Sequence, residues 1–435
     1  MSQWNASEVL GQSLQLKAGA ELKNRIAKAA MSERMAERNG APGERLFRLY
    51  ERWGKSGAGM LITGNVMFDP RGRTELENVV IQDETHLPQL KRWADIAQAE
   101  GSQLWMQISH AGRQASRQVT SRPLAPSPVG LKGFGPLFAK PQPLTEPEIE
   151  EIIRGYARTA LIAKKAGFSG VQIHGAHGYL VSQFLSPLTN KRTDRWGGSL
   201  ENRMRFLLEI LRVTREMVGD DFPVAVKLNS ADFQRGGFSP EESMEVAEVL
   251  EKAGISWLEV SGGNYESPSM TGLTDRGGKM RDSTASREAY FLDYAREIRE
   301  RVSIPLMLTG GLRTAQVMAK VIAEGHVDMV GLARPMALEP ELPKRILSGE
   351  AESALSVNPR VGVKLFDSLI ALEWSVRQMR RMAVGLEPKA TLRAWPTVVL
   401  GFLATLPVHP KQWLWRMPRV QRELETPLKS SNVAG

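Results

Sequence analysis

The residues best suited to chemistry in this chain lie in one short stretch, His174-Gly175-Ala176-His177-Gly178-Tyr179. Two imidazoles can donate N–H groups to one carbonyl or nitro oxygen, which draws electron density out of a conjugated double bond. A tyrosine two residues later can supply a proton, because a phenol with a pKa of about 10 stays protonated at neutral pH. The pattern therefore predicts a catalytic and substrate-binding set of His174, His177 and Tyr179.

Two other interpretations of this stretch stay open at the level of sequence. A His-x-x-His spacing can hold two ligands of a metal, but a zinc site needs a third protein ligand. The chain contains no cysteine and only six histidines, so no ligand-rich cluster is in view and we expect no metal. The histidines could also lie on the surface by chance. The catalytic interpretation is favoured because core packing does not call for three hydrogen-bonding side chains there.

The elements that must position these residues follow an alternating pattern from residue 22 to about residue 350. Short apolar runs, which predict parallel strands buried on both faces, cover 22–30, 59–65, 102–109, 170–175, 222–230, 256–263, 305–311 and 329–335. Helical periodicity covers 44–57, 85–100, 147–167, 200–218, 240–253, 286–301 and 314–324. Thr145-Glu146-Pro147-Glu148 and Ser239-Pro240-Glu241-Glu242 carry helix start signals. The pattern predicts an α/β fold, a TIM (β/α)8 barrel over residues 1–350.

A doubly wound sheet is the competing arrangement for such a pattern. It would usually carry a glycine-rich fingerprint after its first strand, and neither G-x-G-x-x-G nor G-x-x-x-x-G-K-[ST] occurs in the sequence. Residues 110–146, which follow the third predicted strand, are rich in Pro, Gly and basic residues. In a barrel this long loop falls at the carboxyl ends of the strands, where active sites are built.

Other strand ends predict a site for a phosphate and a flavin ring. The seventh run ends in Thr309-Gly310-Gly311 and the eighth in Gly331-Leu332-Ala333-Arg334, where barrel phosphate sites commonly lie. Lys227 and Gln107 are polar residues inside otherwise apolar runs. Burying them costs free energy unless each has a partner. A ring with several carbonyls and nitrogens would provide those partners.

With these residues in place, the segment HGAHGYLVSQFLSPLTNKRTDRWGGSLENRMRFLLEI (174–210) resembles the hallmark segment of the Old Yellow Enzyme family, the FMN-dependent ene-reductases. The resemblance extends over roughly residues 10–350, through LKNRIAKAAMSERM, ITGNVMFDPRGR, MQISHAGRQAS, VAVKLNSADFQRGG and MLTGGLRT to VGLARPMALEPEL. It implies an NAD(P)H:flavin oxidoreductase with FMN bound at the carboxyl-terminal mouth of a barrel. A nicotinamide cofactor, NADH or NADPH, reduces the flavin and leaves before an activated alkene enters.

The resemblance also implies roles for individual residues. His174 and His177 match the pair that binds the electron-withdrawing group, and Tyr179 matches the donor that protonates the alpha carbon while flavin N5 passes hydride to the beta carbon. The residues that match the flavin site are Ala30, Met31, Ser32 and Gly64 around the ring, Gln107 on its pyrimidine edge, Lys227 near N1, and Gly311, Ala333 and Arg334 at the phosphate. Gly310 is added to the predicted cofactor site because it lies beside Gly311 at the end of the seventh run.

This chain departs from some bacterial relatives at two positions. Ser32 stands where those relatives have Cys, and Arg34 stands where they have Tyr. We expect redox tuning and substrate preference to differ accordingly. Two rival functions remain at this level, a Schiff-base lyase that uses Lys227 and a flavin-binding scaffold without catalysis.

Composition narrows the partners and the location. Hydrophobic residues make up 42% of the 435 residues and charged residues 24%, which is ordinary globular usage. No apolar run reaches the ~18–20 residues of a spanning helix, and the amino terminus lacks a signal-peptide pattern, so we expect a cytoplasmic protein. The net charge is +9, yet residues 351–435 hold 12 Lys and Arg against 6 Asp and Glu, so the rest is nearly neutral. We therefore expect small-molecule substrates and no nucleic-acid partner.

Residues 351–435 are not needed for a barrel. The stretches 365–385 and 396–420 mix apolar, basic and tryptophan residues, which predicts a helical extension. Packing on the barrel or on a second subunit of a homo-oligomer is favoured over contact with a membrane surface, although basic residues beside Trp and Leu fit both.

Overall fold

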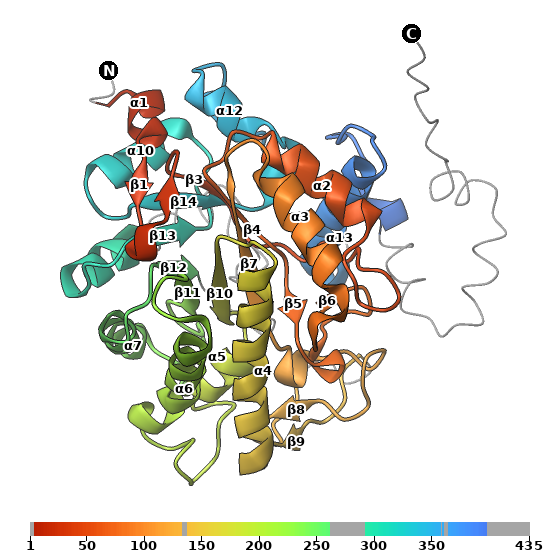
Figure 1. Cartoon of the computed structure of the whole chain (residues 1–435), viewed down its shortest axis with the longest axis vertical. Coiled ribbons are helices and arrows are strands. Elements are labelled where there is room, and N and C mark those ends of the chain that lie inside the picture. Colours follow the sequence, from red (N-terminus) through yellow and green to blue (C-terminus); the bar gives the residue numbers. More distant parts are fainter. Residues whose placement is uncertain (1–3, 133–136, 262–291, 358, 361–363, 398–435) are drawn as a thin grey trace, which may run out of the picture. The chain divides into compact units, whose positions relative to one another are not determined.

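The computed structural model describes residues 4–132, 137–261, 292–357, 359–360 and 364–397 (Figure 1). Eight parallel strands form a closed barrel. In barrel order they are β3 (Ile26–Lys28), β4 (Met60–Ile62), β7 (Gln103–Ser109), β10 (Gly170–Gly175), β11 (Val224–Asn229), β12 (Leu258–Ser261), β13 (Leu306–Thr309) and β14 (Met329–Leu332). Each strand pairs with the next, and the barrel closes because the last strand, β14, pairs with the first, β3. Each lies within one predicted apolar run. The predicted TIM barrel is confirmed.

Helices surround the barrel where the periodicity predicts them. They are α2 (Glu44–Gly54), α3 (Leu87–Gln98), α4 (Glu146–Lys165), α6 (Leu200–Val218), α7 (Pro240–Lys252) and α10 (Ala315–Ala323). Both predicted start signals form capping boxes; in one, the Ser239 hydroxyl accepts from the Glu242 amide while the Glu242 carboxylate accepts from the Ser239 amide, each at 3.2 Å. Of the predicted helix over 286–301, residues 292–301 are helical and residues 286–291 lie outside the described part of the chain.

Helix α13 (Lys364–Ala383) covers the predicted helical stretch 365–385, whereas residues 398–420 of the second predicted stretch lie outside the described part of the chain. Short elements that the sequence did not predict complete the fold. The helices are α1 (Ala6–Gly11), α5 (Leu180–Leu185), α11 (Arg334–Leu338) and α12 (Leu342–Leu347). The strands are β1 (Leu14–Gln15), β2 (Glu21–Leu22), β5 (Val66–Met67), β6 (Val79–Val80), β8 (Leu124–Ala125) and β9 (Gln142–Pro143). Strands β8 and β9 pair with each other within the long loop 110–146.

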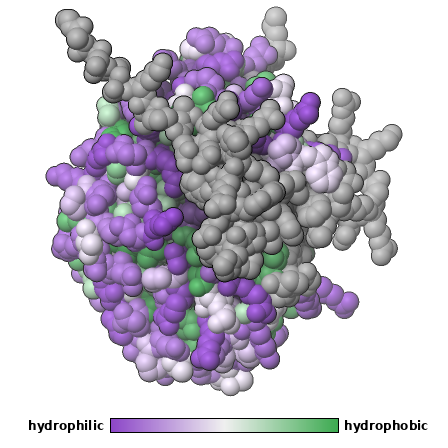
Figure 2. All heavy atoms as spheres, turned by 90° about the vertical axis from the view of Figure 1, so that its right-hand side faces the viewer, coloured by the Kyte–Doolittle hydropathy of each residue, from purple (hydrophilic) through white to green (hydrophobic). Residues whose placement is uncertain are grey.

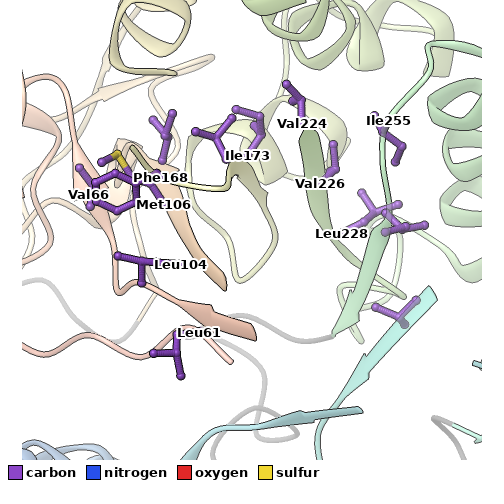
Figure 3. Packing of buried hydrophobic residues seen from close by; sticks show 14 of the residues in the cluster. Leu61, Val66, Leu104, Met106, Phe168, Ile173, Val224, Val226, Leu228 and Ile255 are labelled. Carbon is purple, nitrogen blue, oxygen red and sulfur yellow. The ribbon is translucent and has the colours of Figure 1, made fainter. Parts of the chain in front are cut away.

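The barrel strands carry different side chains on their two faces, because successive residues of a strand point to opposite sides. The outward set forms a large apolar cluster with the helices; Figure 3 shows Leu104 and Met106 of β7, Ile173 of β10 and Val226 of β11 within it. The inward set begins apolar at the amino ends of the strands, where the rings of Trp105 and Trp257 lie 5.4 Å apart. Further along the strands the inward residues become polar, and these polar positions define the candidate site.

Two compact units divide the chain, Met1–Val357 with Ser375–Ala390, and Asn358–Trp374 with Thr391–Gly435. The first unit therefore contains the barrel and the second half of α13. Val376, Met379 and Met382 belong to its core cluster, and Arg52 of α2 forms an ion pair with Glu387 at 2.9 Å. Within the second unit, the Trp374 indole donates to the Leu392 carbonyl at 3.0 Å. The boundary predicted at residue 350 stays a prediction.

The surface is of the ordinary mixed kind. On the face drawn in Figure 2, the coloured residues are mostly hydrophilic with small hydrophobic areas between them, as on most globular proteins. Among the residues that the structure describes, no helix has the length and hydropathy to cross a bilayer.

The packing of α13 gives a first testable prediction. Met379 is fully buried in the core cluster, so we expect Met379→Ala to lower the free energy of unfolding by about 2–5 kcal/mol. Leu372→Ala, at an exposed position of the same helix, should change it by less than about 1 kcal/mol. Denaturant unfolding of both variants measures the difference. Equal stability of the two variants would mean that Met379 contributes no packing to the core of the barrel unit.

Candidate active site

His174, His177 and Tyr179 meet at the carboxyl end of β10, as the sequence predicts for a barrel site. The ring centroid of His174 lies 5.2 Å from that of His177 and 4.8 Å from that of Tyr179. His174 and Tyr179 are almost completely buried. The turn between them is strained at His177, which has a φ of 60° although it is not a glycine, and Gly178 follows with a φ of 73°. A non-glycine residue in this region costs about 1–3 kcal/mol and is often found at functional sites.

The protonation state of His174 follows from its surroundings. Its Nδ1 accepts a hydrogen bond from the Ala176 amide at 3.2 Å, so in the neutral ring the proton lies on Nε2. Burial holds the pKa of His174 well below its usual range, and the neighbouring His177 and Lys227 lower it further. A neutral imidazole with Nε2–H as its donor is therefore the form present at neutral pH.

His177 is held by the two neighbouring strands. Its amide donates to Asn229 Oδ1 of β11 at 3.0 Å, and its Nε2 lies 2.8 Å from Ser261 Oγ of β12. Burial, followed by the charge of Lys227, lowers the pKa of this ring as well. Asn229 and Ser261 were not identified from the sequence.

The long loop 110–146 contributes to the same site through its first residues. Gln114 donates to the His177 carbonyl at 3.0 Å, and Tyr179 packs against Ala111 and Ala115. Gln183 of α5 donates to the carbonyls of Ala111 and Gly178 at 3.0 and 2.7 Å. The loop therefore lies against the histidine–tyrosine turn, which is where the sequence placed it.

Inside the barrel, next to the histidine pair, four inward side chains form a continuous polar chain. Gln107 Nε2 donates to Gln172 Oε1 at 2.7 Å, and Gln172 Nε2 donates to Glu259 Oε2 at 2.7 Å. Lys227 Nζ lies 2.7 Å from Glu259 Oε1. All four residues are buried. Gln107 and Lys227, which the sequence selected separately, are thus joined through Gln172 and Glu259, which it did not select.

The signal that could have identified the missed residues is a spacing of two along the strands. Inward positions alternate, so the polar pairs Gln172 and His174, Lys227 and Asn229, and Glu259 and Ser261 each lie on one face.

The residues predicted around the flavin ring lie after β3 and β4. An added Cβ at Gly64 would stand 2.3 Å from the Met31 carbonyl, so the two loops are in close contact. Asn65 reaches the Ser32 hydroxyl at 3.5 Å. Ala30 and Met31 are partly exposed, as a surface that contacts a ligand must be.

Next to the loops that contain Met31 and Gly64 lies a buried polar cluster, which the sequence analysis did not find. Glu33 accepts hydrogen bonds from the Gly64 amide at 2.9 Å and from the Tyr50 hydroxyl at 2.5 Å. Lys28 Nζ is 3.4 Å from Glu33, and burial lowers the pKa of Lys28 to about 8. β3 turns Lys28 outward toward α2. The cluster therefore holds the backbone of the loops that contain Met31 and Gly64 from the side facing away from the barrel interior.

The ends of β13 and β14 fit the predicted phosphate side. Gly310 and Gly311 have φ values of 134° and 73°, a backbone that side-chain-bearing residues rarely adopt. An added Cβ at Gly331 would stand 2.0 Å from Thr309 Oγ1, and that buried hydroxyl makes no hydrogen bond within the described part of the chain. Ala333 is partly exposed and Arg334 is exposed.

These features test whether the site suits a flavin. Thr309 Oγ1 is a buried oxygen without a hydrogen bond among the described residues, and the glycines at 64, 310 and 311 keep the surrounding backbone free of side chains. Buried polar atoms normally have partners, so a polar planar ligand with a phosphate fits. Within the residues that the structure describes, no three His, Cys, Asp or Glu side chains are grouped to hold a metal.

The chain matches the model of the NADH:flavin oxidoreductase / NADH oxidase family over residues 10–353. It is 36% identical to an NADH oxidase of Thermoanaerobacter brockii over 356 residues, which cover 80% of this chain and 53% of that protein. It is 34% identical to the NADH-dependent flavin oxidoreductase iliE of Hypocrea jecorina (strain QM6a), with 84% of this chain and 94% of the relative covered. This chain thus spans about half the length of the Thermoanaerobacter relative.

Solved structures agree with these relatives. A 2-naphthoyl-CoA reductase complex is similar with a TM-score of 0.71 at 30% identity, covering 79% of this chain and 52% of the other. Morphinone reductase gives a TM-score of 0.66 at 26% identity, with coverage of 80% and 91%. The Old Yellow Enzyme homologue from Zymomonas mobilis gives 0.67 at 25% identity, with coverage of 79% and 94%. The expected resemblance is confirmed: this chain belongs to the NADH:flavin oxidoreductase / NADH oxidase family of Old Yellow Enzyme type, whose members work with FMN and NAD(P)H.

Proposed function

We propose that this enzyme reduces electron-poor alkenes, such as enones, enals and nitroalkenes, with electrons from NAD(P)H. The observation that carries the proposal is the set of His174, His177 and Tyr179 at the end of β10, in which burial lowers the pKa of both imidazoles well below its ordinary value. Neutral imidazole N–H donors bind a carbonyl or nitro oxygen without delivering a full proton to it. They therefore polarise the conjugated double bond and leave the protonation of carbon to another group.

The proposal places FMN between the two sets of residues described above. Gly64 and the segment 30–32 would lie along the ring, Gln107 and Lys227 at its pyrimidine edge, and Gly310, Gly311, Ala333 and Arg334 at the phosphate. FMN supplies transfer of a hydride equivalent between nicotinamide and substrate. The protein's own part is to hold the ring and the substrate in contact and to keep water away, for which the buried His174 and Tyr179 are suited.

The proton balance assigns Tyr179 its task. Reduction of one alkene consumes one NAD(P)H and one proton, because two electrons and one hydrogen come from the nicotinamide and a second hydrogen must be added to the alpha carbon. Tyr179 donates that proton from its hydroxyl and recovers one from solvent. Its ring lies 4.8 Å from that of His174, so a substrate held by His174 is within reach of Tyr179.

The names of two similar proteins bear on the substrate class, and the ion pair of Lys227 bears on the rival lyase function. The names morphinone reductase and 2-naphthoyl-CoA reductase denote a ketone and a thioester, both of which carry a carbonyl group that histidine N–H donors could bind. Lys227 lies in an ion pair with Glu259, and an ammonium in such a pair is not a nucleophile. This arrangement disfavours Schiff-base chemistry at Lys227.

The division of labour is testable by substitution. Tyr179→Phe should leave reduction of the flavin by NAD(P)H intact and slow reduction of an enone by about 100- to 10,000-fold, the usual contribution of general acid catalysis. Stopped-flow absorbance of the flavin measures the two half-reactions separately. Tyr156→Phe, which changes a buried tyrosine of α4 away from the site, is the matched control and should reduce enones at the original rate.

The histidines should behave differently from Tyr179. His174→Ala and His177→Ala are expected to weaken binding of phenolic ligands as well as turnover, since they remove donors that hold the oxygen. Titration of the flavin spectrum with a phenol gives the dissociation constant. An unchanged rate of enone reduction in Tyr179→Phe would show that the proton comes from another donor.

The neutral state of His174 predicts a dependence of stability on pH. The unfolded histidine takes up a proton below about pH 6.5, whereas the folded one, with its lowered pKa, stays neutral there. The unfolded state therefore binds more protons, and stability is lost as the pH falls below about 6.5. His174→Gln should remove up to ~1.4 kcal/mol of this loss for each pH unit in the window.

Denaturant unfolding at pH 8, 6.5, 6 and 5 measures this effect. The difference between His174→Gln and the unsubstituted protein at pH 8 reports what the substitution costs apart from protonation. If both proteins lost stability equally between pH 6.5 and pH 5, His174 would not be buried in its neutral form.

A further inference from the structure

The hydrogen bonds of the polar chain inside the barrel all point the same way, from Gln107 through Gln172 to Glu259, and Glu259 determines this direction. An ionised carboxylate only accepts hydrogen bonds, so the group that Gln172 turns toward Glu259 must be its Nε2, at 2.7 Å. Gln172 then presents Oε1 to the other side, where it accepts from Gln107 Nε2 at 2.7 Å. With one Nε2 hydrogen engaged, Gln107 keeps its Oε1 and its second N–H for a ligand. The orientation of Gln107 on β7 is thus determined by a charge on β12.

Glu259 also acts on Lys227 directly. Its Oε1 lies 2.7 Å from Lys227 Nζ, and both side chains are almost completely shielded from water. Charges at this depth are weakly screened, so each is felt across the barrel interior. Lys227 also lies beside His174 in the pairing of β11 with β10, and its positive charge reaches both histidines of the site. A carboxylate in contact with Lys227 reduces the positive potential that Lys227 produces around it.

We propose that Glu259 is a positioning residue of the flavin site, which offsets the charge of Lys227 and, through Gln172, fixes how Gln107 faces the pyrimidine edge of the bound flavin. The proposal rests on the placement of FMN against Gln107 and Lys227 given above, and it does not depend on the substrate being an alkene. Glu259 needs no contact with substrate or flavin for this role, because it acts through Lys227 and Gln172.

The reduction potential of the bound flavin is the decisive measurement. Reduced flavin carries more negative charge than oxidised flavin, so removing a negative charge nearby favours reduction. We expect Glu259→Gln, as the purified FMN-bound protein, to raise the midpoint potential by about a tenfold shift of the two-electron equilibrium, ~30 mV. Equilibrium reduction against a reference dye measures it. Glu259→Asp, which keeps the charge, should stay closer to the original potential than Glu259→Gln.

Glu242→Gln is the matched control for loss of a carboxylate. Glu242 lies in α7 outside the barrel interior, where it pairs with Arg203 of α6. Its removal should leave the flavin potential unchanged. Lys227→Gln tests the placement of the flavin itself, since loss of the cation should lower the potential. If none of these substitutions altered the potential, the flavin would not lie against this chain of residues.

A double variant covers the case in which Glu259→Gln does not fold, since removing one partner leaves the other charge buried and unpaired. Lys227→Gln with Glu259→Gln leaves neither charge. If the two charges offset each other at the flavin, the double variant should keep the original potential. A potential as low as that of Lys227→Gln alone would show that Lys227 acts unopposed, and this would overturn the electrostatic part of the proposal.

The orientation of Gln107 has its own test. Gln172→Met removes the connecting amide and leaves both charges in place. We expect the dissociation constant of FMN to rise roughly fivefold, the effect of a typical net hydrogen bond. Fluorescence titration of flavin-free protein with FMN measures this. Unchanged affinity in Gln172→Met would show that Gln107 is oriented without help from Glu259. An unchanged or lower potential in Glu259→Gln would overturn the electrostatic part of the proposal.

Discussion

The register of β10 between β7 and β11 is the constraint on which the site depends. On one side Gln172 is the pairing partner of Gln107, and on the other His174 is the partner of Lys227. Because side chains alternate along a strand, a slip of one residue would turn His174 toward the helices and Ile173 toward the site. Closure of the barrel holds β10 on both edges, which makes that slip costly. The proximity of the histidines to Lys227 is therefore a consequence of backbone hydrogen bonding.

The sequence was sufficient for the existence of the barrel strands but not for their ends. An apolar run such as 22–30 marks a segment buried on both faces, whereas β3 includes only Ile26–Lys28 because pairing with both neighbours stops there. Capped helices such as α7 were predicted closely, since a capping box is a local signal. Short elements such as β5 and α5 were missed because tertiary contacts stabilise them and too few residues are involved to show a period.

The candidate site likewise contains some residues that the local sequence identifies and others that can be recognised only in the folded structure. His174, His177 and Tyr179 could be found from residue type and spacing because they lie in one turn. Glu259 could not be found in this manner, since its importance comes from Lys227 and Gln172, which are adjacent only after the strands have paired. The assignments to individual flavin contacts came from resemblance, and the structure adds the reason that polar residues are tolerated there. Each buried polar side chain of the chain from Gln107 to Lys227 has another as its partner.

The change from apolar to polar side chains along the barrel interior explains how such a site is compatible with a stable fold. At the amino ends of the strands, Trp105, Trp257 and their apolar neighbours pack into a hydrophobic cluster, which favours folding. Toward the carboxyl ends the interior holds a buried ion pair and the strained turn at His177, both of which cost free energy. These two unfavourable features thus lie at the end of the barrel that holds the candidate site. Binding of a polar ring to Gln107 and Lys227 would add favourable contacts at that end and so stabilise the folded protein.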